Sequence, residues 1–259
     1  MNHAIVKYES KDRVAYITLN RPEKRNALSD EMVSELKKAF KQAEEDAQAK
    51  VIVLQANGES FCAGADLAYL QQLQANTLQQ NHEDSTHLKE LFFQIYTLPK
   101  IVIAAVQGHA LAGGCGLASV CDFSLSVPSA KFGYTEVKIG FIPAIVMYFL
   151  VKKIGEGKAR QLLLSGDLIT AEQATEMGLI NQVVEAERLQ EQVSSLAQQL
   201  ITQNSAQAMA TTKKMLATIS GLDVNSALAY AAAMNAEARA TADCKKGIAA
   251  FLKKEKISW

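Results

Sequence analysis

Two short stretches decide how this chain folds: FCAGADL at residues 61–67 and GHALAGGCGL at residues 108–117. Each follows an apolar run of strand length, residues 51–54 and 101–106, and each leads into a helical pattern. Small residues at such a turn let a ligand approach the backbone closely. Because the free N–H groups at the start of a helix favour negative charge, two such turns could direct two N–H groups at one oxygen.

The chain around these stretches alternates strand and helix patterns. Residues 4–9, 14–19 and 123–126 are predicted strands, and Ser29 is a predicted N-cap of the first long helix. Residues 71–90 are rich in Gln, Asn and His with weak periodicity, which predicts a mobile helix or loop.

A helical pattern fills the end of the chain. Between residues 158 and 184 the breaks Ser165-Gly166 and Met177-Gly178 separate short helices, and from residue 187 the pattern is helical almost throughout. We therefore expect an α/β fold without a low-complexity linker: a core over residues 1–200 and a helical region over residues 201–259 of the same structural unit.

The composition excludes several classes of partner. The 259 residues are 49% hydrophobic, with 27 Lys and Arg balanced by 27 Asp and Glu, so no bulk charge draws the chain to nucleic acid or an anionic membrane. The four cysteines lack close metal-ligand spacing, and the first residues lack an apolar signal core. We expect a reduced, cytoplasmic protein.

One segment is long enough to cross a membrane. Residues 101–121 carry no charge, but Gln107 and His109 interrupt them and four glycines break their regularity. A buried strand, a loop and a buried helix explain the segment better than a spanning helix.

The two opening stretches belong to a longer series. FCAGADL, GHALAGGCGLASVCD (108–122), AKFGYTEVKIGFIP (130–143) and SGDLITAEQATEMGLINQVV (165–184) resemble successive blocks of the crotonase superfamily, the enoyl-CoA hydratase/isomerase family. The opening NRPEKRNALS (20–29) and the ending KGIAAFLKKEKISW (246–259) fit the same pattern. The resemblance covers essentially the whole chain, in order and at the usual spacing.

The resemblance implies a crotonase-like spiral of ββα repeats, followed by C-terminal helices that form a trimerisation region, often with two trimers stacked as a hexamer. It implies an acyl-CoA thioester as substrate and no cofactor, since coenzyme A is part of the substrate. The family's oxyanion-hole amides fall on Ala65 and Gly113, and a catalytic carboxylate falls on Glu136.

Gly116 is a departure from the family's pattern, because hydratases of the family typically place a second glutamate there. With Glu136 alone, one group must both take a proton and return it. This leaves open a hydratase that uses one acid/base glutamate and a Δ3,Δ2-enoyl-CoA isomerase. We also expect Gly116 to open space for a water or a larger acyl group.

The resemblance also places substrate contacts. Candidate substrate-binding residues near the reacting centre are Ala63, Asp66, Leu67, Tyr69, Gly116 and Ile142. The nucleotide contacts, often given by a neighbouring subunit, fall on Phe251 and Lys254. Each has a structural alternative: Asp66 as a helix cap, Leu67, Tyr69 and Ile142 as packing residues, and Lys254 as part of a solvated basic tail.

The acyl group is less defined by the sequence. Hydration of a 2-enoyl-CoA with a short or branched acyl group, such as one of the methylglutaconyl-CoA type, is the leading hypothesis. Pro143-Ala144-Ile145-Val146 replaces a stretch that is often glycine-rich, which leaves the pocket floor open, and an acyl-carrier protein could replace coenzyme A.

A non-catalytic or RNA-binding relative is the remaining alternative. Lys37, Lys38 and Lys41 share the first long helix with Glu35 and Glu44, so a solvated mixed-charge surface explains them better than an RNA-binding face.

Overall fold

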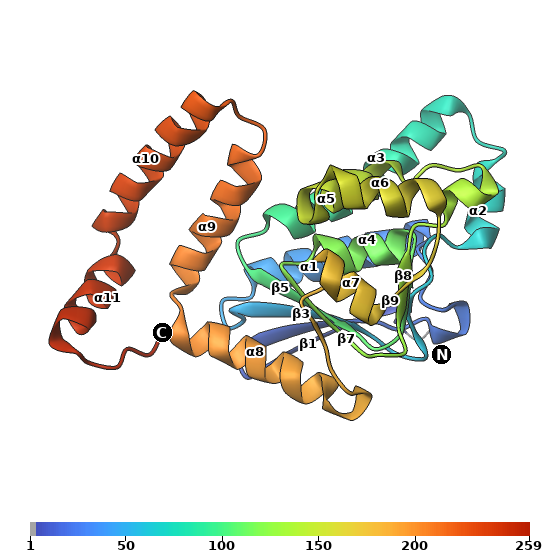
Figure 1. The fold of residues 1–259 in the computed structure, drawn as a ribbon. Helices are drawn as coiled ribbons and strands as arrows, with labels where there is room; N and C mark the ends of the chain where they lie inside the picture. The colour runs from blue at the N-terminus through green and yellow to red at the C-terminus, as the bar shows by residue number, and fades with distance from the viewer. Residues whose placement is uncertain (1–3) are drawn as a thin grey trace.

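The computed structural model describes residues 4–259, whose strands form two sheets (Figure 1). The larger sheet has the order β1 (Val6–Lys11), β2 (Val14–Leu19), β3 (Val51–Ala56), β5 (Ile101–Val106), β7 (Phe123–Ser126) and β10 (Gln182–Val183). The smaller sheet has the order β4 (Ser60–Cys62), β6 (His109–Leu111), β8 (Lys131–Gly133) and β9 (Ile169–Thr170). β1 and β2 are antiparallel, and the larger sheet is parallel from β2 onward.

The chain moves between the two sheets in a regular way. β3, β5 and β7 belong to the larger sheet, and each is followed directly by a strand of the smaller sheet, β4, β6 and β8. After β4 and β6, helices return the chain to the next strand of the larger sheet, and after β8 the chain passes through α5, α6 and β9 of the smaller sheet before α7 leads to β10. This is the predicted repetition of ββα units.

The first helix forms where the sequence predicts it. α1 (Asp30–Glu45) begins after Ser29, whose Oγ accepts a hydrogen bond from the amide of Met32 at 3.3 Å. Its buried face contains the residues at spacing three and four that the pattern indicated: Met32, Val33, Leu36, Ala39, Phe40 and Ala43. β1 begins two residues later than predicted, at Val6.

Of the two alternatives predicted over residues 71–90, a mobile helix or a loop, the structure shows a helix over most of that range. After the short α2 (Leu67–Leu73), α3 (Leu78–Thr97) is a continuous 20-residue helix. A capping box starts it: the Gln80 amide donates to Thr77 Oγ1 at 3.3 Å, and the Thr77 amide donates to Gln80 Oε1 at 2.8 Å. Its buried residues all lie after position 90, which explains the weak periodicity before it.

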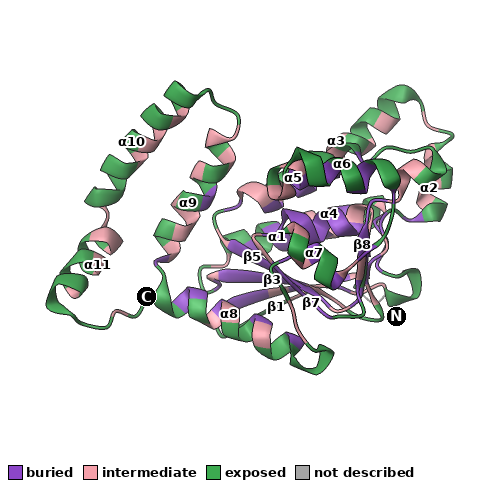
Figure 2. Cartoon of the chain, viewed as in Figure 1, coloured by how far each residue is buried: buried purple, intermediate pink, exposed green. Residues whose placement is uncertain are grey.

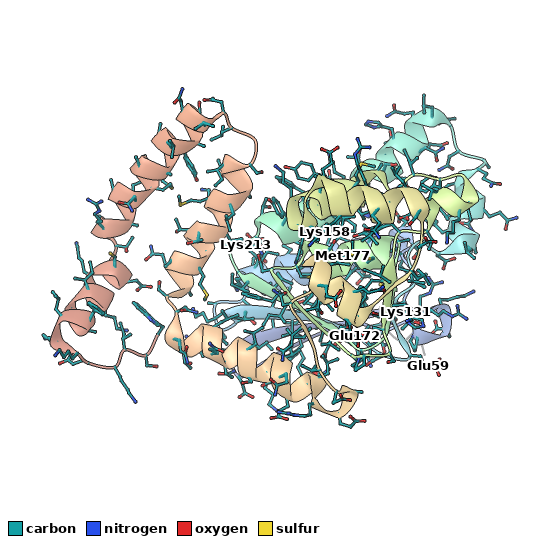
Figure 3. The ribbon with its side chains drawn as sticks, in the orientation of Figure 1. Glu59, Lys131, Lys158, Glu172, Met177 and Lys213 are labelled. Carbon is teal, nitrogen blue, oxygen red and sulfur yellow. The ribbon has the colours of Figure 1, made fainter. Side chains whose placement is uncertain are left out.

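Four helices follow in the middle of the chain: α4 (Gly113–Val120), α5 (Ala144–Ile154), α6 (Glu156–Ser165) and α7 (Ala171–Met177). Gly166 and Gly178 end α6 and α7 in left-handed conformations, at the two breaks that the sequence predicted. Lys158 of α6 donates to the carbonyl of Met177 at 3.1 Å and so joins these two helices (Figure 3).

The last four helices divide into two groups. α8 (Leu189–Gln203) packs on the larger sheet through five buried apolar residues. α9 (Ala206–Ile219), α10 (Val224–Ala240) and α11 (Ala242–Lys253) form an arm beside the body of the molecule (Figure 1). Within the described chain, α10 and α11 contain no buried residue (Figure 2).

A buried ion pair attaches the arm to the body. Lys213 of α9 is only 6% exposed, and its Nζ lies 2.7 Å from Asp122 Oδ2 and 3.0 Å from the carbonyl of Lys100 (Figure 3). The same Asp122 oxygen accepts a hydrogen bond from the amide of Val102 at 2.8 Å. The charge of Lys213 is therefore neutralised where β5 and β7 begin.

The uncharged segment over residues 101–121 forms the predicted buried strand, β5, and the predicted buried helix, α4, and the predicted loop between them contains the short strand β6. In the part of the chain that the structure describes, no helix has the length and apolarity required to span a membrane.

Replacement of Lys213 tests the attachment of the arm. We expect Lys213→Met to lower the free energy of unfolding by about 3 kcal/mol, because Asp122 would keep its charge without its partner. Urea unfolding followed by circular dichroism measures the change. Lys214→Met removes the same charge from an exposed neighbour and should change stability by less than about 0.5 kcal/mol. Equal effects of the two substitutions would contradict a specific role for the buried pair.

Candidate active site

The three predicted catalytic positions lie at one edge of the smaller sheet. β4, β6 and β8 are adjacent parallel strands, with Cys62 paired to Ala110 and Leu111 paired to Gly133. Ala65, Gly113 and Glu136 follow the last residues of these strands within three positions. Because parallel strands end at the same edge of a sheet, the topology brings all three together there.

Two glycines let the first two loops approach each other. A Cβ added to Gly64 would lie 2.8 Å from Ala112 Cβ and 3.6 Å from the amide nitrogen of Gly113. A Cβ added to Gly114 would overlap the carbonyl of Cys62. The loop after β4 and the turn after β6 are therefore in backbone contact, which a side chain at either glycine would prevent.

Leu28 contacts both the loop after β4 and the turn after β6. Its amide donates to the carbonyl of Gly64 at 2.7 Å, and its carbonyl accepts from the amide of Asp66 at 2.8 Å. Its side chain fills the space beside Gly113, where an added Cβ would lie 2.9 Å from Leu28 Cδ1. Leu28 therefore fixes the backbone on both sides of Ala65 and also contacts the turn that carries Gly113.

The Ala65 and Gly113 amides are available to a ligand. Gly113 is the first residue of α4, where a helix leaves its N–H groups without intrahelical partners. The preceding residue, Ala112, has φ 49° and ψ −122°, an uncommon conformation for a residue with a side chain. Among residues 4–259, neither of these two N–H groups donates a hydrogen bond.

Glu136 carries a partly buried carboxylate. It begins the short 3₁₀ helix η2 (Glu136–Ile139), which closes with a hydrogen bond from the amide of Phe141 to the carbonyl of Glu136 at 3.0 Å. Its Oε2 is buried without a hydrogen-bond partner in the described residues. Desolvation by burial raises the pKa of this carboxyl above the 4.5 of an ordinary glutamate, against a smaller opposing effect of its own amide.

Asp66 caps α2, which is the structural alternative that the sequence offered, and its role in binding substrate stays a prediction. Its Oδ1 accepts from the amides of Ala68 at 2.9 Å and Tyr69 at 3.3 Å, and its Oδ2 lies 2.9 Å from Arg21 Nη1. Burial alone would raise the pKa of this carboxyl, but the two amides and the guanidinium together lower it. Both oxygens are therefore occupied, as a cap of α2 requires.

Ala63, Leu67 and Ile142 lie beside these loops. Ala63 is half-buried and donates its amide to the carbonyl of Arg25 at 3.0 Å, while Leu67 and Ile142 are well exposed, Leu67 at 76%. Because both side chains are exposed, Leu67 and Ile142 are not packing residues of the core in this chain. Their role in binding substrate stays a prediction.

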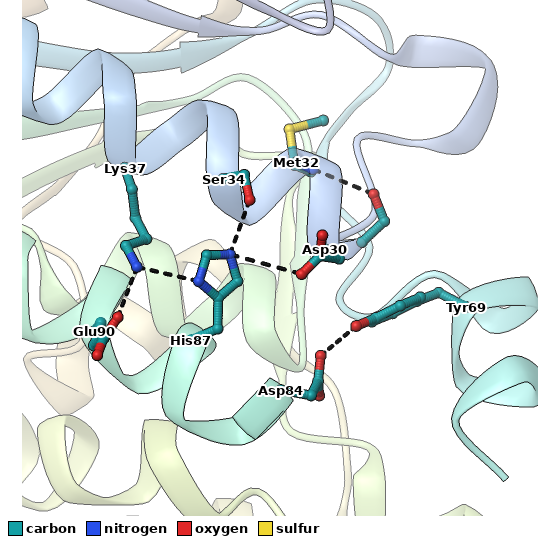
Figure 4. Close-up of polar contacts among 9 residues, drawn as sticks. Asp30, Met32, Ser34, Lys37, Tyr69, Asp84, His87 and Glu90 are labelled. Atoms are coloured by element: carbon teal, nitrogen blue, oxygen red, sulfur yellow. Dashed lines mark hydrogen bonds and ion pairs between the residues drawn. The ribbon is translucent and has the colours of Figure 1, made fainter. Parts of the chain in front are cut away.

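Tyr69 connects α2 with α3. Its hydroxyl donates to Asp84, so the polar end of the side chain points toward α3 (Figure 4). Burial and this carboxylate raise the pKa of the Tyr69 hydroxyl well above its usual range. The phenol is therefore neutral and engaged, which leaves only the ring available to a substrate.

The expectation of open space beside Gly116 is wrong. Gly116 is buried in α4, and a Cβ added to it would overlap Val146 Cγ1 of α5 and lie 3.0 Å from Phe92 Cε1 of α3. The position that could have carried a second carboxylate is occupied by apolar side chains, so neither a water nor a carboxylate fits beside Gly116.

Phe251 and Lys254 lie away from the sheet edge. Both are exposed, Phe251 at 81%, at the end of α11 in the arm (Figure 1). Within one chain, the fold does not bring them to Ala65, Gly113 or Glu136.

Neighbouring polar residues have structural partners. His109 Nδ1 accepts from the amide of Lys131 at 3.1 Å, and Tyr134 is fully buried with its hydroxyl 3.3 Å from Ser119 Oγ. Burial raises the pKa of the Cys115 thiol to about 12.

Among the residues described, no group of three or more His, Cys, Asp or Glu side chains is placed to hold a metal ion.

Sequence reasoning missed two residues that shape the site, Leu28 and Val146. The NRPEKRNALS motif pointed to the region of Leu28 but not to its contact with Gly113. The replacement of glycines by Ala144-Ile145-Val146 was the signal for Val146.

The fold and the site together define a class of protein: a spiral of ββα units with two free amides and one buried carboxylate at a sheet edge, followed by a helical arm. The family model for enoyl-CoA hydratase/isomerase matches residues 9–259. The chain belongs to this family and is an enzyme of the enoyl-CoA hydratase type.

Several relatives support this assignment. A protein of Thermus thermophilus, named as a candidate enoyl-CoA hydratase, is 40% identical over 244 residues, covering 94% of this chain and 96% of the relative. The crotonyl-CoA hydratase of Syntrophomonas wolfei is 34% identical over 255 residues, covering 97% and 96%. The crystal structure of a Mycobacterium smegmatis enoyl-CoA hydratase matches with a TM-score of 0.92 at 29% identity, covering 99% of each chain. The predicted crotonase fold is thereby confirmed.

The raised pKa of Glu136 predicts a pH-dependent difference in stability. Below pH 4.5 the carboxyl is protonated in both the folded and unfolded states, and Glu136→Gln should resemble the unmodified protein. As the pH rises from 4.5 through the higher folded-state pKa, the unfolded state loses its proton first, so the unmodified protein loses stability that Glu136→Gln keeps.

Urea unfolding from pH 4 to pH 8 measures this difference. Glu59→Gln, which makes the same change at an exposed glutamate, should leave the pH profile unchanged. A Glu136→Gln protein that is less stable than the unmodified one at pH 7 would contradict a desolvated carboxylate.

Proposed function

We propose that this enzyme adds water to a 2-enoyl-CoA thioester, with Glu136 as the single acid/base group and the Ala65 and Gly113 amides as the oxyanion hole. One observation carries the proposal: a buried carboxylate oxygen without a partner in the described residues shares a sheet edge with two amides that donate to nothing there. Such groups favour a reaction in which negative charge develops on an oxygen while a proton moves nearby.

The proton balance needs only one carboxylate. The Glu136 carboxylate removes a proton from water, the water oxygen bonds to Cβ of the substrate, and the electron pair of the C=C bond moves toward the thioester oxygen. The enolate oxygen accepts hydrogen bonds from the Ala65 and Gly113 amides. Protonated Glu136 then returns the proton to Cα, which restores the carboxylate. The raised pKa suits this role, because it makes the carboxylate a stronger base.

Isomerisation of a 3-enoyl-CoA is the second candidate. Val146 and Phe92 occupy the space beside Gly116, so a second carboxylate for activating water is absent from that position. One carboxylate can move a proton between C2 and C4 without water. Hydration remains the leading candidate, because the named relatives are hydratases.

For the acyl group, we propose a short chain, with a branched group of the methylglutaconyl type as the alternative. The crotonyl-CoA hydratase of Syntrophomonas wolfei and the short-chain-enoyl-CoA hydratase of Clostridium acetobutylicum, 32% identical over 259 residues, support the first. Coenzyme A is the proposed carrier, and an acyl-carrier protein is the alternative. The proposed mechanism uses backbone amides and a carboxylate and requires no cofactor.

The arm is the proposed trimerisation region. α10 and α11 bury no residue in this chain, although exposed apolar side chains lie on both, including Leu228 at 64% and Leu252 at 75%. A helix pair with uncovered apolar side chains is typical of an interface. A neighbouring subunit could then bring Phe251 to the adenine and Lys254 to a phosphate of coenzyme A, in a homotrimer or a pair of trimers.

An RNA-binding role is not favoured by the charges on α1. Lys37 lies 2.7 Å from Glu90 (Figure 4), Lys38 lies 2.7 Å from Glu35, and Lys41 lies 3.9 Å from Glu45. Each lysine has its own carboxylate, so α1 presents no concentrated basic face.

The oligomer can be tested on the arm. The native mass should be three or six times 28.1 kDa by light scattering, and Leu228→Asp should reduce it by placing a charge in the apolar contact. Leu164→Asp makes the same change at an exposed leucine of α6, outside the arm, and should keep the native mass. A monomeric unmodified protein would overturn the proposal.

Glu136→Gln tests the mechanism. We expect kcat on crotonyl-CoA to fall at least about 100-fold, because the amide can neither take nor return a proton. Binding of the CoA ester, measured by calorimetry, should stay close to that of the unmodified enzyme. Because desolvation raises the pKa of Glu136, the acid limb of kcat/KM should lie above pH 4.5.

The products separate the two candidate reactions. Mass spectrometry should show the gain of one water on crotonyl-CoA, whereas a shifted double bond in a 3-enoyl-CoA without added mass would favour the isomerase. Glu59→Gln serves as the exposed control and should keep full turnover. Near-normal turnover in Glu136→Gln would remove Glu136 from the mechanism.

A further inference from the structure

The side chains packed against Gly116 form a wall at the inner side of the site. Gly116 is three residues after Gly113 in α4, so the two lie on the same face of the helix, one turn apart. An acyl chain whose thioester oxygen is held by the Gly113 amide meets the face of α4 near Gly116 if it runs inward. What covers Gly116 therefore limits the inward path.

Two apolar residues from different helices cover it. Val146 of α5 is 4% exposed and Phe92 of α3 is fully buried, and both lie where a Cβ of Gly116 would be. Val146 lies in the first turn of α5, which Pro143 precedes as the N-cap and which is the next helix after η2, the segment that contains Glu136. The same stretch of chain thus carries the acid/base group and one part of the wall.

A second layer lies behind the first. Phe149 of α5 stacks on Phe92, with ring centroids 5.9 Å apart, and meets Tyr96 edge-on at 5.3 Å. Phe149 also lines a surface groove of about 590 Å³ between α3, α5 and α9. The groove and the inner side of the catalytic edge are therefore separated by Val146, Phe92 and Phe149.

We propose that Val146 and Phe92 close the inward end of the acyl site and so limit the enzyme to short 2-enoyl thioesters. The inference rests on the proposed function, because it needs the oxyanion site at Ala65 and Gly113. The wall is expected to be rigid. A β-branched valine has few χ1 rotamers available, and a phenylalanine that is packed in the interior has no free space into which it can turn. We expect a four-carbon chain to end before the wall and an eight-carbon chain to run into it.

Chain-length profiles test this wall. We would measure kcat/KM of the unmodified enzyme, Val146→Ala and the control Met147→Ala on 2-enoyl-CoA esters of four, six, eight and ten carbons. The ratio of eight-carbon to four-carbon kcat/KM should be below about 0.1 for the unmodified enzyme and rise at least tenfold in Val146→Ala. Met147 is an exposed neighbour on α5, and its truncation should leave the ratio unchanged.

Each outcome has a defined meaning. A flat profile in the unmodified enzyme, or the same ratio in folded Val146→Ala, would overturn the wall while leaving hydration intact. Failure of the unmodified enzyme to hydrate any ester would instead remove the proposed function. If Val146→Ala does not fold, Phe92→Leu carries the test, because it shortens the wall with a smaller loss of volume, and the same rise in ratio is expected.

Discussion

The structure depends on the backbone contact between the end of β4 and the start of α4. Gly114 lies against the carbonyl of Cys62, and Gly64 lies against Ala112, with no room for a side chain at either glycine. This contact places the amides of Ala65 and Gly113 at one sheet edge, and the pairing of β6 with β8 then adds Glu136. The geometry of the site follows from the absence of two Cβ atoms.

The electrostatics of the site follow from the same packing. Glu136 Oε2 is buried without a partner in the described residues, and desolvation by this burial raises the pKa of the carboxyl. A hydrogen-bond donor in that position would stabilise the carboxylate but weaken it as a base. The same reasoning applies to the amides of Ala65 and Gly113. A hydrogen bond to an acceptor within the chain would occupy these N–H groups, and they could then no longer donate to a ligand.

The sequence predicted the strands that carry a clear pattern and missed the shortest ones. β5 was found at its observed bounds because an apolar run marks it, and β2 and β7 because their residues alternate, whereas β4, β6 and β8 are three residues long and carry no recognisable period. Glu136 was singled out through its block and its catalytic role stays a prediction, whereas the space beside Gly116 was predicted wrongly. That space depends on how α5 packs on α4, a contact between residues 30 positions apart that no local pattern reports.

The helical arm is attached where β5 and β7 begin, whereas the candidate active site lies further along the same two segments of the chain. Asp122 precedes β7, whose chain continues through β8 to Glu136, and Val102 lies at the start of β5, whose chain continues through β6 to Gly113. The ion pair of Lys213 therefore joins the arm to the beginnings of the two segments that end at the site. An arm fixed in this way can place Phe251 and Lys254 against another subunit without contacting the catalytic edge of its own chain. In the proposed mechanism Ala65, Gly113 and Glu136 all come from one chain, so association in the proposed oligomer would affect the binding of coenzyme A more directly than the proton transfer.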